Sequence, residues 1–250
     1  MRPRSAIVLF ALIVWLGSRN GFAQSPEAFL VLGAGHFGSW TTEYVFANDS
    51  DTPIAFDISF QANIQAPCPA PCQGFLSVSV PANGAVAVSQ QVSSFFAHYL
   101  VGFALPRVRA RILSSGSPQL GADLPVFRVA TLRSLNPTSL VFPIRPEAMR
   151  TNLLLSNVID IGQAADLLGD MTVKVDVFGA DGGLLATRTV VAPSDLGQTY
   201  IVDIGQFMGI PNPTAGQVRA TRISGGGVMW GILPSLNSDG TISITLGEVP

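Results

Sequence analysis

Residues 54–62 read IAFDISFQA, and this stretch decides the fold class. Every second residue in it is apolar, from Ile54 to Ala62, and the residues between are small or polar. Strict alternation of this kind is typical of a β-strand with one face in the core and the other in solvent. The stretch therefore predicts one long, half-buried strand.

The same alternation recurs along the chain. Apolar residues occupy every second position in four further stretches: 76–80, 108–112, 171–177 and 242–246. Turn-forming residues separate such stretches, for example Pro81-Ala82-Asn83-Gly84 and Asp181-Gly182-Gly183, as in hairpin connections. Because alternation leaves one face of each sheet in solvent, a parallel sheet covered on both faces is excluded. We predict an all-β fold of antiparallel β-sandwiches.

Helical periodicity is scarce. We predict one short helix at Val92–Leu100 and another at Ile204–Met208, at equivalent places in the two halves of the chain. Each helix is expected to cover one end of its sandwich. Ile161–Leu168 predicts a helical turn in the second half only.

The second half of the chain repeats the first. Thr42–Asn48 (TEYVFAN) matches Thr151–Asn157 (TNLLLSN), and Val108-Arg109-Ala110 recurs as Val218-Arg219-Ala220. Further matches are the equal spacings Pro81 to Phe95 and Pro193 to Phe207, and the triplets Ser134-Leu135-Asn136 and Ser235-Leu236-Asn237. A repeat of about 110 residues is a domain, because solenoid units run about 20–50 residues. The pattern predicts two tandem sandwiches, 28–143 and 144–249.

Residues 1–23 have the features of a secretory signal peptide. Arg2 and Arg4 precede the apolar run Ile7–Leu16, which is short for a bilayer span, and Gly21-Phe22-Ala23 offers small residues to a signal peptidase. We expect cleavage after Ala23 and a secreted or periplasmic protein. An uncleaved signal anchor is the alternative.

Charge and hydropathy restrict the partners. Without residues 1–23 the chain keeps 11 of its 14 basic residues and all 16 acidic ones, a net charge of −5. This mild acidity argues against nucleic acid, which requires clustered cations. No later stretch is long and apolar enough to predict a membrane span. The expected partner is a protein or a glycan at the cell surface.

Together these features resemble a secreted bacterial β-sandwich module of the immunoglobulin-like kind, present here as a tandem pair. The first unit opens with Phe37–Thr42 (FGSWTT), then an alternating strand and Asn48-Asp49-Ser50. The second opens with Arg150-Thr151-Asn152 and a strand ending at Asn157, and its later motifs are Asp181-Gly182, Val218-Arg219-Ala220 and Asn237–Gly240. The resemblance covers nearly all of the chain after the signal. It implies fold and export, and no activity.

The two cysteines, Cys68 and Cys72, flank Pro69-Ala70-Pro71 within one loop. An exported protein meets oxidising conditions, which favour a disulfide. A zinc site needs more nitrogen or sulfur ligands than this pair supplies, and a redox pair normally reads C-x-x-C before a helix. We predict a structural disulfide that closes the loop.

Motifs for catalysis and for cofactors are weak. The chain has two histidines, His36 and His98, and no G-x-S-x-G elbow. We expect His98 to pack beside aromatic residues. Gly33-x-Gly35-x-x-Gly38 precedes a strand where a dinucleotide fingerprint needs a helix, so we interpret it as a flexible segment and expect no cofactor.

We therefore predict a non-catalytic binding or structural module. One alternative is a secreted hydrolase. An esterase would need a histidine base, and a glycosidase two carboxylates from Glu27, Glu43, Glu147 and Glu248. The other alternative is a periplasmic two-domain protein of the chaperone type.

Two loops gather oxygen ligands of the type that calcium prefers. The candidate residues are Asn48, Asp49, Asp51, Asn237 and Asp239. The same residue types favour Asx turns, in which a side-chain oxygen accepts a hydrogen bond from a nearby backbone N–H. We favour turns over calcium at both places and predict no metal.

Overall fold

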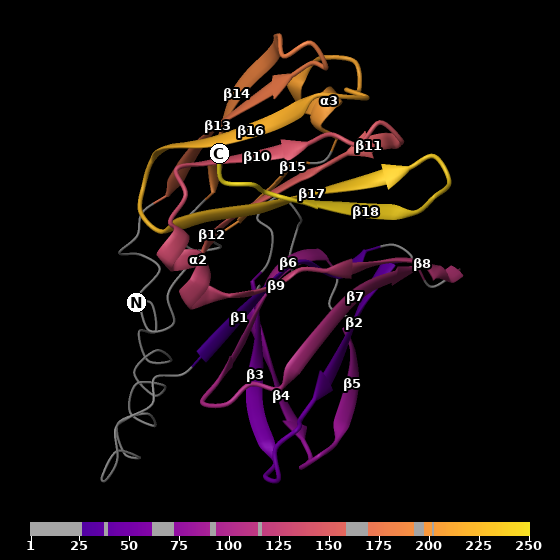
Figure 1. Ribbon diagram of the computed structural model, residues 1–250, viewed down its shortest axis with the longest axis vertical. Helices are drawn as coiled ribbons and strands as arrows, with labels where there is room; N and C mark the ends of the chain where they lie inside the picture. Colours follow the sequence, from indigo (N-terminus) through magenta and orange to yellow (C-terminus); the bar gives the residue numbers. More distant parts are fainter. Residues whose placement is uncertain are drawn as a thin grey trace, which may run out of the picture.

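Figure 1 shows the computed structural model of the protein. It describes residues 27–37, 40–61, 73–90, 94–114, 117–158, 170–192, 198–201 and 203–250. These residues form eighteen strands and two short helices, so the predicted all-β fold is confirmed. Neither helix is long and apolar enough to span a membrane. The predicted signal peptide, Cys68, Cys72 and Ile161–Leu168 lie outside the described residues.

The first half ends with helix α2. Its elements are β1 (Glu27–Phe37), β2 (Trp40–Ala47), β3 (Ile54–Gln61), β4 (Gln73–Val80), β5 (Ala85–Gln90), β6 (Ser94–Gly102), β7 (Arg107–Ser114), β8 (Ser117–Leu124), β9 (Val126–Arg128) and α2 (Val129–Leu135). The predicted strand at residues 54–62 is confirmed as β3. Its inward residues Phe56 and Ile58 are buried, as the alternation requires.

The nine strands of this half form one sheet that folds over into two layers. One layer has the order β4-β3-β6-β1 with β9 beside β1, and the other has the order β5-β2-β7-β8. Phe37 pairs with Trp40 where β1 turns into β2 and joins the layers. Phe46 of one layer meets Phe56 of the other edge to face, with ring centroids 4.8 Å apart. The apolar core of the first half lies between the layers.

The helix predicted at Val92–Leu100 is wrong. Residues 94–102 form strand β6, which lies between β1 and β3 in the middle of its layer. Short apolar runs do not distinguish a buried strand from a buried helix. The run is rich in aromatic residues, which suit a central strand, and pairing on both sides satisfies its backbone.

The second half is a sandwich of two separate sheets. Its elements are β10 (Ser139–Pro143), β11 (Ala148–Thr151), β12 (Leu153–Val158), β13 (Met171–Phe178), β14 (Leu184–Ala192), β15 (Gln198–Ile201), α3 (Ile204–Met208), β16 (Gln217–Ser224), β17 (Val228–Asn237) and β18 (Ile242–Leu246). One sheet has the order β10-β16-β13-β14. The other has the order β11-β17-β12-β15 with β18 beside β17. The helix predicted at Ile204–Met208 is confirmed as α3, and the Asp203 side chain accepts a hydrogen bond from Gln206 N to cap it.

The strand pairings of the two halves correspond. Strand β2 pairs with β5 and β7, as β12 pairs with β15 and β17. Strand β3 pairs with β4 and β6, as β13 pairs with β14 and β16. The pairs β1–β6 and β7–β8 correspond in turn to β10–β16 and β17–β18.

This correspondence shows which of the sequence matches join structurally equivalent strands and which do not. Thr42–Asn48 and Thr151–Asn157 lie at equivalent places, on β2 and β12. Val108–Ala110 lies on β7 but Val218–Ala220 lies on β16, the counterpart of β6. The second match therefore joins strands that are not equivalent, because similar alternating strands resemble one another in sequence wherever they pair.

The pairing of the outer strands departs from an immunoglobulin sandwich. There the first strand lies beside the second and the seventh beside the sixth. Here β1 pairs along most of its length with β6, and β7 pairs with β2. The fold is compatible with a β-sandwich, but the pairing of β1 and β7 differs from that of an immunoglobulin sandwich.

Strand β1 is buried on both faces and ties the halves together. Leu30 and Leu32 belong to the apolar core of the second half, whereas Val31 and Ala34 belong to that of the first. All four side chains are completely buried. The flexible segment expected around Gly33 is therefore wrong, because this glycine lies inside a central strand.

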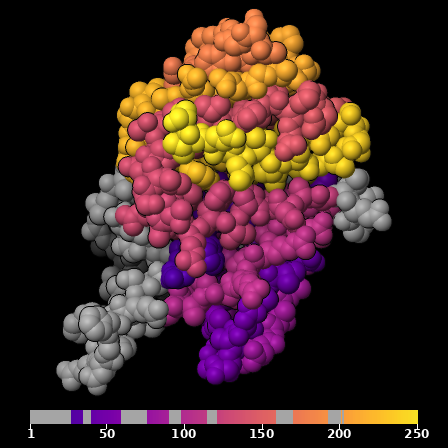
Figure 2. Space-filling model, in the orientation of Figure 1, coloured from indigo at the N-terminus to yellow at the C-terminus, as the bar shows by residue number. Residues whose placement is uncertain are grey.

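Contacts from other elements widen this junction. Helix α2 adds Val129 and Leu132 to the core of the second half. Phe127 of β9 meets Trp230 of β17 edge to face, with ring centroids 5.5 Å apart. In the other direction, Ile242 of β18 packs against the core of the first half. Figure 2 shows the two halves in contact across the width of the molecule.

Candidate functional site: a cavity at the junction

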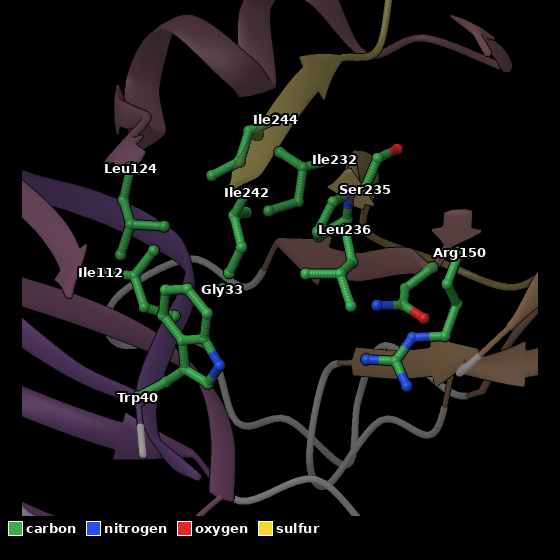
Figure 3. A pocket seen from close by; sticks show the side chains of 12 residues that line it. Gly33, Trp40, Ile112, Leu124, Arg150, Ile232, Ser235, Leu236, Ile242 and Ile244 are labelled. Carbon is green, nitrogen blue, oxygen red and sulfur yellow. The ribbon is translucent and has the colours of Figure 1, made fainter. Parts of the chain in front are cut away.

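A small cavity of about 70 Å³ lies between the two halves (Figure 3). We call it the junction cavity. The first half lines it with Gly33, Trp40, Ile112 and Leu124, and the second half with Arg150, Asn152, Ile232, Pro234, Ser235, Leu236, Ile242 and Ile244. Most of this lining is hydrocarbon, and Arg150 is its one charged side chain among the described residues.

Gly33 brings β1 close to β17 at the cavity. Its φ is +80°, and a Cβ at this position would lie 3.0 Å from Ile232 Cδ1. The register between β1 and β6 also shifts between Val31 and Ala34. A residue without a side chain is therefore required here for both the backbone conformation and the close approach.

Trp40 and Arg150 enter the cavity from different halves. Trp40 opens β2 and is half-buried, whereas Arg150 lies on the short strand β11 just before β12. Because β2 and β12 are equivalent strands, the starts of two equivalent segments meet at this cavity. In Figure 3 the two side chains lie on opposite sides, with Leu236 between them.

Arg150 is available to a ligand. Its side chain is exposed, and it forms no hydrogen bond or ion pair with any residue that the structure describes. Other exposed arginines have acidic partners: Arg107 pairs with Asp49, and Arg109 with Asp123 at 3.3 Å. The guanidinium at the cavity is therefore a cation without an anionic partner among the described residues.

Two buried polar side chains complete the lining. Asn152 is 6% exposed, and its Oδ1 accepts a hydrogen bond of 2.9 Å from Asp203 N. This bond fixes the orientation of the amide, and the amide N–H groups have no partner among the described residues. Ser235 is 1% exposed, and its hydroxyl lies 3.4 Å from Thr151 Oγ1.

The cavity is chemically suited to hold a group that is apolar on one side and negative on the other. Its described lining contains no histidine and no carboxylate. The hydroxyl of Ser235 therefore has no base beside it in this lining, as nucleophilic catalysis requires.

His98, the candidate base, lies in the core of the first half. It and Tyr44 are completely buried, and the Tyr44 hydroxyl forms a hydrogen bond with His98 Nδ1. Burial lowers the pKa of His98 to about 3 and raises the pKa of Tyr44 well above its usual value. The imidazole is therefore neutral and packed among aromatic side chains, on a strand and not on the expected helix. The side chain of His36, on β1, lies outside the described residues.

The calcium candidates of the first loop take part in a turn. Asn48 Oδ1 accepts hydrogen bonds from Ser50 N and Ser50 Oγ, at 2.9 and 2.7 Å. Asp49 forms an ion pair with Arg107, and Asp51 is exposed. The amide of Asn48 also reaches three backbone carbonyls, so both of its ends are used within the protein.

The second loop has the same kind of turn. Asp239 Oδ1 accepts hydrogen bonds from Thr241 N and Thr241 Oγ1, and these bonds lower the pKa of its carboxyl group. Asn237 Nδ2 donates to Thr241 Oγ1 at 2.9 Å. Among the described residues, no group of three or more histidine, cysteine, aspartate or glutamate side chains is placed to hold a metal ion.

The glutamates proposed for a glycosidase lie on different elements. Glu27 is on β1 and Glu43 on β2. Glu147 lies 3.7 Å from Arg145, and the backbone of Glu248 bridges to Val141. None of the four lines the junction cavity.

Sequence reasoning missed the junction cavity. Trp40 and Arg150 stand in the two segments, Phe37–Thr42 and Arg150–Asn152, that open the two similar units. That shared position was the available signal, but only the packing of the halves brings the segments together. No protein-family model, curated protein or solved structure matches this chain.

Proposed function

We propose that this protein is an exported, non-catalytic binding module and that its ligand site is the junction cavity. One observation carries the proposal. Arg150, an exposed cation without a partner among the described residues, borders a cavity that is otherwise mostly hydrocarbon. A few convergent polar groups in an apolar concavity are characteristic of ligand sites.

Export is the part of the proposal that rests on sequence alone. Residues 1–23 have the three regions of a signal peptide. The pair Cys68 and Cys72 suits an oxidising compartment, where it would close a loop as a disulfide. The resemblance to tandem secreted bacterial sandwich modules points the same way. The corresponding strand pairings of the two halves support an origin by duplication.

The position of the site between two halves lets one ligand contact both of them. Residues from both halves form the walls, so an occupant would contact β1, β2, β11 and β17 together. The partner is a protein or glycan at the cell surface, or a small molecule released there. The negative charge of the mature chain, −5, disfavours nucleic acid.

Tryptophan fluorescence tests the proposal. Trp40 lines the cavity, so a ligand should change its emission in the full-length exported protein. We expect a screen of cell-surface peptides, saccharides and small acids to give such a change. Arg150→Gln should lower the affinity for the ligand at least about tenfold. Arg145→Gln is the matched control, because Arg145 is exposed and lies outside the lining.

Two results would contradict the proposal. One is binding that survives both Arg150→Gln and Trp40→Phe unchanged, which would place the site elsewhere. The other is turnover of ester or glycoside substrates that depends on Arg150. Cell fractionation tests export separately, because an uncleaved chain in the cytoplasm would exclude it.

A further inference from the structure

We infer that the group held in the junction cavity is a carboxylate joined to a short apolar group. The inference rests on the proposed function and adds the chemical class of the ligand. It follows from three properties of the lining: a guanidinium without a partner among the described residues, an oriented amide and a hydrocarbon wall of limited volume.

The guanidinium selects the anion. Arg150 presents a planar fork of N–H donors, which matches the two oxygens of a carboxylate in a bidentate pair. No carboxylate among the described residues pairs with it, so a ligand would displace none of these residues. A phosphate would leave an oxygen facing hydrocarbon, because the lining offers no second cation.

The amide of Asn152 supplies the second donor. Its side chain is 94% buried, and the hydrogen bond from Asp203 N to Oδ1 determines which end is the donor end. Asn152 lines the cavity, so its amide N–H groups can donate to a ligand there. A carboxylate bound at Arg150 provides two acceptor oxygens at the same cavity.

The remaining lining sets the size of the apolar group. Ile232, Ile242, Ile244 and Leu236 form a hydrocarbon wall from the second half, and Trp40 stands on the opposite side (Figure 3). A cavity of about 70 Å³ admits a group of a few carbon atoms, since drug-sized ligands use about 300–1,000 Å³. The ligand group is therefore the size of one aliphatic side chain.

Two kinds of ligand contain a carboxylate joined to a short apolar group. One is a free short-chain carboxylic acid. The other is the last residue of a polypeptide, in which an α-carboxylate stands next to an apolar side chain. The experiment separates them with a series of straight-chain acids and with a tetrapeptide that ends in leucine, each beside its neutral amide.

Calorimetric titration of the full-length exported protein tests the inference. We expect the carboxylates to bind at least about tenfold more tightly than the matched amides, because a hydrogen-bonded charge is lost in the amide. Affinity should rise about fourfold for each added methylene until the cavity is full, and then stop rising. Arg150→Gln should remove the preference for the acid, Arg150→Lys should restore part of it, and Arg145→Gln should leave it unchanged.

The outcomes distinguish the two proposals. If amides bind as tightly as acids through Trp40, the cavity is a binding site but the carboxylate inference is wrong. If neither acids nor amides bind, the carboxylate inference is also wrong, and a hit from the wider fluorescence screen would still support the proposed function. Binding of the free acids without the peptide assigns a small acid, and the reverse assigns a chain terminus.

Discussion

Asn48 and Asn157 occupy equivalent positions in the two halves, yet only one of them has its hydrogen bonds satisfied. Each is the last residue of its matched segment, Asn48 just after β2 and Asn157 within β12, and both are buried, at 2% and 0% exposure. The Asn48 amide donates to the carbonyls of Thr52, Val80 and Pro81 and accepts from Ser50. Neither Nδ2 nor Oδ1 of Asn157 has a partner among the described residues.

The two asparagines should respond oppositely to substitution. Asn48→Ala leaves three carbonyls and a backbone N–H without their partner and should lower the free energy of unfolding by about 1–3 kcal/mol. Asn157→Leu replaces an unsatisfied buried amide with hydrocarbon of similar size and should be neutral or stabilising. Urea unfolding measures both. A larger loss for Asn157→Leu than for Asn48→Ala would contradict this assignment.

Gly227 should tolerate no side chain, because Asn157 fills the space next to it. Its φ is +81°, and a Cβ there would lie 1.8 Å from Asn157 Oδ1. Gly182 is the matched control, since its φ is +80° and nothing lies within 4 Å of its Cβ position. Gly182→Ala should cost about 1 kcal/mol of backbone strain.

Gly227→Ala should cost clearly more than its control when both are compared by thermal unfolding. The difference between the two variants isolates the steric clash from the backbone strain they share. Equal losses would show that Asn157 moves aside freely.

Acid should destabilise the protein through His98. An unfolded histidine has a pKa near 6.5, whereas burial lowers the pKa of His98 in the fold to about 3. Between these values the unfolded chain binds a proton that the folded chain does not. The free energy of unfolding therefore falls as the pH drops from about 6.5 toward 3, by at most about 1.4 kcal/mol per pH unit from this residue.

Nuclear magnetic resonance measures this directly. The ring signals of His98 should stay constant from pH 7 down to pH 5 in the folded protein. Urea unfolding over the same pH range should show the loss of stability. The control variant His36→Gln should show the same loss, because His98 is still present. A His98 signal that titrates near pH 6.5 without unfolding would contradict the buried, neutral imidazole.

The two halves should unfold together, because β1 and α2 contribute side chains to the core of the second half. Trp40 and Trp230 report on opposite sides of the junction. In protein from which residues 1–23 have been removed, Trp230→Phe leaves Trp40 as the reporter, and Trp40→Phe leaves Trp230. The two variants should show the same denaturant dependence for fluorescence and for circular dichroism. A separate, earlier transition at either tryptophan would indicate that the halves are independent.

The sequence predicted the half-buried strands well and the fully buried ones poorly. Alternation at 54–62 identified β3 because one face of that strand is wet. In β6 the successive residues His98, Tyr99 and Leu100 are all buried, so the strand shows no alternation there and its sequence resembled a helix. Residues 30–34 of β1 are buried on both sides, and Gly33 suggested flexibility where the fold uses it for close packing. Alternation appears in a sequence only where one face of a strand is exposed, so it was a poor guide to these two strands.

The junction cavity was beyond the reach of such patterns for a different reason. Trp40 and Arg150 are 110 residues apart, and nothing in either segment specifies the other. Their meeting depends on the packing of β1 against β17 and of β18 against the first half. Only the three-dimensional arrangement of two similar units determines it.

Strand β1 has a consequence for the order in which the chain acquires its structure. It is the first described strand to leave the ribosome or an export channel, yet Gly33 rests on Ile232, about 200 residues later. The first half can cover one face of β1 early, but the face that packs against the second half stays exposed until β17 has been synthesised. Contacts between such distant residues form slowly. Until then Leu30 and Leu32 lack the partners that bury them in the fold, and they form an apolar surface of the kind that chaperones bind.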